Sequence, residues 1–181
     1  MRLRARYVAL AGLLLVAGIL TRGHEPVAAQ EVPKAAQKAL GEKGVAIVQK
    51  ATKVEAFRIS PKRTDKKGDK YIGGYPILDT AKELDKNFAA KFAKVLLSDK
   101  VYAGDSERCY EPGVAFRLWQ DKNAVEVIIC FRCTNFEVHV MGAERGEELD
   151  LHGFGPGLEP FLALAKEAFP KDNEIQGLKS K

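Results

Sequence analysis

The chain of 181 residues carries a formal net charge of +5, with 29 basic and 24 acidic side chains. Residues 1–29 hold four arginines and one glutamate, so the remaining residues have 25 basic and 23 acidic side chains and a net charge of +2. Nucleic-acid binding needs concentrated basic charge, so this near-balance argues against it, and no apolar run beyond residue 29 is long enough to cross a bilayer.

The first 29 residues have the three parts of a secretory signal peptide. Three arginines within the first six residues precede an uncharged apolar run of 13 residues, 8–20, and small side chains at 27–29 fit the site that a signal peptidase reads. A membrane-spanning helix needs about 20 apolar residues. We therefore predict a signal peptide over 1–29 and export to the periplasm or the extracellular space, with an uncleaved N-terminal anchor as the alternative.

The segment that follows predicts an interrupted helix. Residues 33–40 are rich in alanine, and Pro33 suits a first helical turn because its missing N–H is not needed there. Glycine weakens helices. We expect Gly41 and Gly44 to interrupt the helix before it resumes over 45–52.

The next residues predict two strands separated by a polar segment. Residues 54–59 alternate in polarity, which predicts a strand that ends before Pro61. The basic run 62–70 contains two acidic residues and no aromatic residue, so we interpret it as a solvated loop rather than a polyanion contact. Residues 75–78 predict a short edge strand, because Pro76 has no N–H to donate to a sheet.

The clearest amphipathic pattern predicts a helix that begins at Asp79 or Thr80. Thr80 and Glu83 fit a capping box, in which each side chain accepts a hydrogen bond from the backbone of the other residue. One helical stripe is apolar, which indicates a core face rather than a ligand groove. Its residues are Leu84, Phe88, Phe92 and Val95 or Leu96.

Three strands are predicted to form an antiparallel meander near 113–141. Residues 114–119 alternate, 121–123 suits a hairpin turn, and 125–131 is almost wholly apolar, as in a central strand buried on both faces. The alternation in 135–140 predicts a strand with one wet face. Its solvent-exposed residues would be Asn135, Glu137 and His139.

The C-terminal region predicts a loop and a final helix. A glycine-rich loop is expected over 142–157, followed by a helix from near Pro160 to before Pro170, and Asp172 can cap one more short turn. The order of elements predicts a single α+β domain over 30–181, with an antiparallel sheet and helices packed on one of its faces.

Three cysteines, Cys109, Cys130 and Cys133, are the residues most informative about chemistry. Residues three apart on a straight strand lie about 10 Å apart and point to opposite faces, whereas a disulfide needs Cα atoms within about 7 Å. Cys130 and Cys133 can therefore converge only if the chain bends at 131–132. A bend at Thr134-Asn135 would instead place Cys130 at the strand end and Cys133 in the turn.

Three roles for the cysteines stay open. A disulfide from Cys109 to Cys130 or Cys133 suits an exported chain, and closing a loop of about 20 residues would contribute on the order of 3 kcal/mol. Zinc could bind the three thiolates with His152 as a fourth ligand, although the second CxxC of a zinc ribbon is missing. Thiol–disulfide exchange is the third role, but no helix is expected after the CxxC to lower the thiol pKa.

Five segments form a further pattern: VEAFR at 54–58, GGYPIL at 73–78, Cys109 followed by PGVAFR at 112–117, ICFRC at 129–133 and AFP at 168–170. Together they resemble a group of exported bacterial proteins for which no activity is established. The resemblance covers most of the chain beyond the leader, and the cysteine block is its most specific part. Some relatives carry histidine after Cys-x-x-Pro, where this chain has Gly113, which argues against a Cys/His metal site.

The sequence contains none of the common catalytic motifs GxSxG, HExxH, GxGxxG and P-loop. We therefore predict an exported, non-enzymatic binding or envelope-associated domain that is stabilised by a disulfide and has no cofactor. The alternative is a thiol-dependent metal-binding or redox protein that uses Cys109, Cys130 and Cys133.

Overall fold

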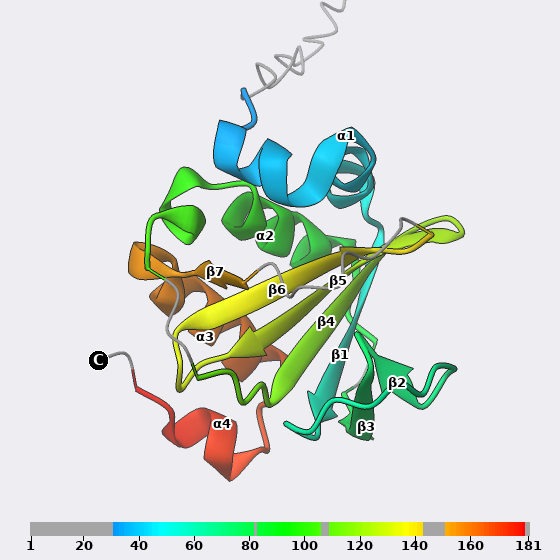
Figure 1. Cartoon of the computed structure of the whole chain (residues 1–181), viewed down its shortest axis with the longest axis vertical. Coiled ribbons are helices and arrows are strands. Elements are labelled where there is room, and N and C mark those ends of the chain that lie inside the picture. Colours follow the sequence, from blue (N-terminus) through cyan, green and yellow to red (C-terminus); the bar gives the residue numbers. More distant parts are fainter. Residues whose placement is uncertain (1–30, 82, 106–108, 143–150, 180–181) are drawn as a thin grey trace, which may run out of the picture. The chain divides into compact units, whose positions relative to one another are not determined.

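Seven antiparallel strands form one curled sheet, and helices cover one of its faces (Figure 1). This computed structural model describes residues 31–179 apart from 82, 106–108 and 143–150, so the predicted signal peptide over 1–29 lies outside the described residues. In chain order the strands are β1 (Lys53–Ile59), β2 (Tyr71–Ile72), β3 (Tyr75–Thr80), β4 (Val114–Gln120), β5 (Asn123–Cys130), β6 (Asn135–Val140) and β7 (Leu151–Gly153). Across the sheet they lie in the order β2-β3-β1-β4-β5-β6-β7.

Four α-helices and two short 3₁₀ turns complete the described residues. They are α1 (Lys34–Lys50), α2 (Lys86–Leu96), η1 (Asp99–Tyr102), η2 (Gly155–Gly157), α3 (Leu158–Ala168) and α4 (Asn173–Gly177). None of these helices is long and apolar enough to span a bilayer. The predicted α+β class, with an antiparallel sheet and helices on one face, is confirmed.

The main core lies between the sheet and the helices. Phe92 of α2 has its ring centre 4.8 Å from that of Phe116 on β4 and 5.6 Å from that of Phe161 on α3. Phe88, one helical turn before Phe92, packs at 6.2 Å from Phe116. Because all four rings are buried, this aromatic cluster holds α2 and α3 against the strands and leaves the opposite face of the sheet for other contacts.

The two glycines of α1 have different roles. Gly41 adopts φ 62° and ψ 172° and breaks the helical geometry, as the sequence predicts. Gly44 stays helical, so the predicted second interruption is wrong. A Cβ atom at Gly44 would lie 2.8 Å from Cγ2 of Val140. Glycine at this position therefore allows α1 to approach β6 closely.

The start of α2 also differs from the prediction. Thr80 is the last residue of β3 and pairs with Phe57 of β1, so it does not cap a helix with Glu83. The side chain of Asp85 accepts hydrogen bonds from the backbone N–H groups of Asn87 and Phe88 instead. The sheet pairing of β3 thus delays the helix to Lys86, although the predicted apolar stripe does face the core.

β2 and β3 form a short arm at the end of β1 (Figure 1). β2 arises within the segment expected to be a loop, and it rather than β3 lies at the edge of the sheet. A second, smaller core forms where the arm covers the helix-free face of the sheet. It consists of Phe57, Ile59, Ile72, Tyr75, Ala115 and Ile128, with Ile77 and Tyr110 packed against it.

The face of β6 that was predicted to be exposed to solvent is largely buried. The predicted meander is present, and β5 is buried on both faces as expected. However, Asn135 is fully buried, Glu137 is 1% exposed, and the side chain of His139 is 14% exposed. Alternation in polarity thus marks two faces of β6, but it does not mark one of them as solvated.

The C-terminal region contains more structure than the predicted loop. β7 and η2 lie within 142–157, and β7 pairs with β6. The predicted final helix is present as α3, and the side chain of Asp172 accepts the N–H of Ile175 to cap α4, as expected.

Candidate functional site

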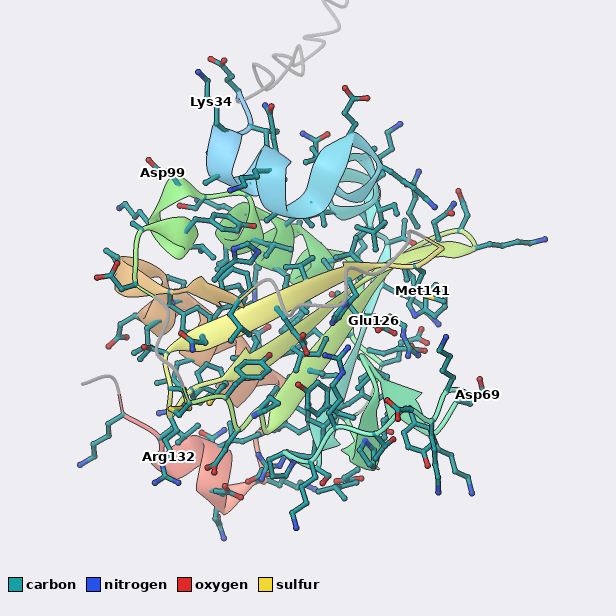
Figure 2. All side chains as sticks on the ribbon, in the orientation of Figure 1. Lys34, Asp69, Asp99, Glu126, Arg132 and Met141 are labelled. Atoms are coloured by element: carbon teal, nitrogen blue, oxygen red, sulfur yellow. A yellow bond between two sulfur atoms is a disulfide. The ribbon has the colours of Figure 1, made fainter. Side chains whose placement is uncertain are left out.

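A cleft of about 660 Å³ opens on the helix-free face of the sheet. Its walls come from the polar segment 66–74 before and around β2, and from β4, β5 and the end of β6. Asp69, Glu126 and Met141, which come from three different parts of the chain, all line it, and Figure 2 shows them on the same side of the molecule. We call this feature the cleft throughout.

A buried ion pair forms the floor of the cleft. Arg117 and Glu126 are directly opposite each other on β4 and β5. Nε and Nη2 of Arg117 donate to Oε1 of Glu126 at 3.1 and 2.9 Å, and the backbone N–H of Gly73 donates to Oε2 at 2.9 Å. A buried ion pair is tolerated when its remaining polar atoms are also bonded. Glu126 meets this condition and ties the arm to the sheet.

The single tryptophan of the chain forms one wall. Nε1 of Trp119 donates to Oε2 of Glu55 at 2.7 Å, which fixes the indole ring beside β1. The guanidinium of Arg117 lies 5.7 Å from the centre of the same ring and 5.3 Å from that of Phe57. These contacts add cation–π attraction to the ion pair. The floor and this wall are therefore one connected and rigid unit.

A second acidic side chain lies behind the cleft without a hydrogen bond. Glu137 is almost fully buried, and neither of its carboxyl oxygens has a hydrogen-bond partner in the described part of the chain. Oε2 of Glu137 lies 3.2 Å from Nε2 of His139, whose ring lines the cleft. The prediction that His139 is solvent-exposed is therefore wrong. The ring both lines the cleft and lies next to a buried carboxyl group.

Two tyrosines, Tyr75 and Tyr110, lie near the carboxyl group of Glu137. Burial, and then the charge of Glu137, raise the pKa of Tyr75 well above its usual range. The same two causes raise the pKa of Tyr110, whose hydroxyl donates to the carbonyl of Ile128 at 3.0 Å. Both phenols are therefore uncharged at neutral pH, and the region around Glu137 has a low dielectric constant.

The mouth of the cleft is polar and exposed. Lys66, Lys67 and Asp69 line it from the segment that precedes β2. None of their side chains makes a salt bridge to another described residue. Met141, which is 41% exposed, supplies an apolar surface on the other side. Charged groups at the mouth thus surround a rigid interior that is partly aromatic.

The cysteines lie further along β5, beyond the cleft. A turn over 131–134 follows directly after Cys130, and Thr134 in it has φ 55°. Cys130 thus lies at the strand end and Cys133 in the turn, as expected, but the turn already begins at Phe131 and ends before Asn135, which is the first residue of β6. Cys109 and Cys133 form a disulfide with a Cα–Cα distance of 5.9 Å, and Cys130 is a buried free thiol.

His152 does not lie with the cysteines. It pairs with Phe136 across β7 and β6, and its ring centre lies 5.2 Å from that of Phe136 and 5.5 Å from that of Tyr102 on the helix-covered side. Cys130 pairs with Asn135 and faces the other side of the sheet. Within the described ranges, no group of three or more His, Cys, Asp or Glu side chains is placed to hold a metal ion.

The cleft was not predicted from the sequence, although one local pattern in the sequence points to it. A two-residue turn at Asp121-Lys122 pairs Gln120 with Asn123 and therefore brings Arg117 opposite Glu126. Glu126 is also a single charge in an otherwise apolar strand, and such a charge is rarely buried unless it is paired. The contribution of segment 66–74 could not be found in this way, because no local pattern shows where a loop folds back.

Comparison with known proteins gives no further identification. The chain matches no protein-family model, no curated protein and no solved structure. Its function is therefore inferred from the residues of the cleft and the cysteine cluster.

Proposed function

We propose that the protein is an exported, non-enzymatic binding domain whose ligand site is the cleft. Small-molecule sites are typically concave, measure about 300–1,000 Å³, and combine apolar walls with a few fixed polar groups. The cleft has this size and composition. The observation that carries the proposal is the floor, in which Arg117 pairs with Glu126 and Glu126 also accepts the N–H of Gly73, beside the wall formed by Trp119.

The chemistry of the lining supports binding rather than catalysis. The described residues that line the cleft include no serine, threonine or cysteine, the residues that most often act as covalent nucleophiles. Both carboxyl oxygens of Glu126 accept hydrogen bonds from Arg117 and from the N–H of Gly73, so this carboxylate already serves to hold the arm on the sheet. A site whose strong polar groups are occupied in this way is suited to holding a ligand unchanged.

Two features support export of this binding domain. The pattern over 1–29 fits a signal peptide, and structural disulfides such as Cys109–Cys133 form and persist in oxidising compartments. An envelope-associated role in the periplasm or outside the cell follows from the same proposal. Mass measurement of the protein recovered from the exporting cell tests it, since cleavage before Gln30 is expected and a mature chain that begins at Met1 would contradict it.

A thermal-shift screen tests the binding site. A panel of amino acids, sugars, nucleotides and aromatic acids is added to the purified protein, and a true ligand at 100 times its Kd should stabilise it by about 2.7 kcal/mol. Met141→Trp should abolish the stabilisation because it fills the mouth of the cleft. Leu78→Trp is the matched control, since Leu78 is also an exposed apolar residue but lies outside the cleft. Stabilisation that survives Met141→Trp would place the ligand elsewhere.

A second candidate function is thiol–disulfide exchange. The backbone N–H of Cys133 donates to Sγ of Cys130 at 3.2 Å, so a free thiol lies in the same turn as a bridged sulfur. Attack by the Cys130 thiolate on Sγ of Cys133 would form the Cys130–Cys133 bond and release Cys109 as a thiolate. Cys109 is exposed and could then react with a partner thiol or disulfide.

Disulfide mapping in glutathione buffers tests this second candidate. If exchange occurs, mildly reducing conditions should give peptides that contain a Cys130–Cys133 bond, together with glutathione attached to Cys109. The variant Cys130→Ala is the control, because it cannot form the new bond. Detection of the Cys109–Cys133 bond alone under all conditions would exclude exchange and leave the bridge with a structural role.

A further inference from the structure

We infer that the cleft takes a small organic anion, namely a flat ring that carries a carboxylate, sulfonate or phosphate group. The inference rests on the proposed function, because it names the ligand class for the same site. The polar groups on the floor of the cleft are already bonded within the protein, whereas the charged groups at its mouth form no salt bridge to another described residue. The inference follows from this difference.

The floor of the cleft offers a ligand no unpaired charge. Arg117 donates to Glu126 through two nitrogens, and its Nη2 also lies 3.4 Å from the carbonyl oxygen of Tyr71. Its Nη1 lies 3.6 Å from the carboxylate of Glu55. A ligand that displaced any of these partners would leave a buried group unsatisfied, which is unfavourable. Recognition of ligand charge therefore falls to the groups at the mouth.

Among the described residues that line the cleft, positive charge is in excess at the mouth. Lys66 and Lys67 provide two ammonium groups, and Asp69 provides one carboxylate, none of them in a salt bridge to another described residue. Concave sites with low-dielectric walls concentrate the potential of such charges. The balance at the mouth therefore attracts an anion.

The one carboxylate behind the cleft does not oppose this attraction directly. Glu137 is buried and is not part of the lining, and its Oε2 lies 3.2 Å from Nε2 of His139, whose ring does line the cleft. Because Glu137 does not line the cleft, a ligand can pair with the lysines at the mouth without contacting this carboxylate.

The apolar part of the lining indicates a flat ring. Tyr71 and Trp119 contribute aromatic surfaces, and Met141 contributes a thioether that is partly exposed. Aromatic rings and polarisable sulfur favour contact with a planar, polarisable group. Because these surfaces lie next to the lysines, one ligand can place its ring against them and its acidic group at the mouth.

A matched pair of fluorescent probes tests the inference. Anilinonaphthalenesulfonate is an anion, and N-phenylnaphthylamine has the same ring system without the sulfonate. Trp119 is the only tryptophan in the chain and lines the cleft, so quenching of its emission reports binding there. We expect the anion to bind at least about tenfold more tightly than the neutral probe, and its affinity to fall as ionic strength rises.

Charge-neutral variants test which residues provide the selectivity. Lys66→Gln with Lys67→Gln should weaken binding of anilinonaphthalenesulfonate by about tenfold and leave the neutral probe unaffected. Lys62→Gln with Lys70→Gln is the matched control, since both lysines are exposed in the same segment but lie outside the lining. The control should retain the affinity of the unmodified protein, and an equal loss in both variants would overturn the inference.

The outcomes distinguish this inference from the proposed function. Equal quenching of Trp119 by both probes would overturn the anion preference and leave the cleft as a binding site. Binding of neither probe would also overturn the inference, and the thermal-shift screen would then decide the proposed function separately. Tight binding of the anion that leaves Trp119 emission unchanged would place the anion site outside the cleft and contradict the inference.

Discussion

At the scale of single residues, the fold depends on buried charges that the protein itself pairs. Glu126 is 8% exposed as a side chain and is held by Arg117 and the N–H of Gly73. Glu137 is buried beside His139, Tyr75 and Tyr110. Because an ionised group is costly to bury without partners, the bonds that Glu126 makes to Arg117 and Gly73 hold the arm on the sheet.

Replacement of Arg117 should reveal how strongly the pair is coupled. Arg117→Met leaves the Glu126 carboxylate buried without its cation, and we expect a loss of about 3–5 kcal/mol in the free energy of unfolding. The double variant Arg117→Met/Glu126→Leu should lose much less, because no unpaired charge remains. Urea unfolding of both variants measures the difference. Additive effects of the two single substitutions would show that the pair is not coupled.

The buried tyrosines predict how stability depends on alkaline pH. Burial raises the folded-state pKa of Tyr75 above its ordinary value of 10.0. Since the folded pKa exceeds the unfolded one, the stabilisation is complete below about pH 10 and is lost as pH rises further. Tyr75→Phe should therefore flatten the decline in the unfolding midpoint above about pH 10. An equally steep decline in the variant would exclude Tyr75 as a cause.

Some residues of the site could be predicted from the sequence, and others could not. The register of the β4–β5 hairpin was accessible, so the pairing of Arg117 with Glu126 was predictable in principle. The burial of Glu137 and His139 was not, because it depends on Tyr75 and Tyr110 from other parts of the chain covering β6. Contacts between segments distant in sequence leave no periodic pattern to detect.

At the scale of elements, local sequence patterns predicted most of the strands and helices. They did not predict the changes that contacts with other elements impose on where these elements begin and end. The hairpin of β4 and β5 and the cap of α4 by Asp172 were confirmed because their determinants are local. The expected capping box at Thr80 was wrong because pairing with β1 extended β3 through that residue. Gly44 was misassigned because its role is set by contact with β6.

Substitution of Gly44 tests the close approach of α1 to β6. A Cβ atom there would lie 2.8 Å from Val140, so Gly44→Ala should destabilise the protein by about 1–3 kcal/mol despite the better helix propensity of alanine. Gly177→Ala in α4 is the control, since nothing lies within 4 Å of its added Cβ atom. Thermal unfolding of the two variants provides the comparison. A stabilised Gly44→Ala protein would contradict the packing.

At the scale of the whole molecule, the described residues place two chemical centres at separate positions along β5. The cleft uses Glu126 in the middle of the strand, and the thiol cluster begins at Cys130, where the strand ends. The disulfide fixes Cys109 to the β5–β6 turn through a sequence separation of 24 residues. The bridge therefore restrains the chain that leads into β4, which carries the floor of the cleft.

Loss of the bridge should lower stability without removing the cleft. Closing a loop of this length contributes about 3 kcal/mol, so Cys109→Ser should lower the Tm by about 10 °C. Cys130→Ala should keep the two-proton mass deficit of the bridged protein, because Cys130 is the free thiol. Mass spectrometry without reductant and a melting curve measure both effects. An unchanged Tm in Cys109→Ser would exclude a stabilising bridge.

The central claim is that ligands bind to the helix-free face of the sheet, beside Trp119. Because the chain has a single tryptophan, its indole N–H gives one assignable nuclear magnetic resonance signal. Titration with the compound that stabilises the protein most in the thermal screen is predicted to shift this signal in a saturable way. A compound that saturates the protein while the signal stays in place would contradict the claim.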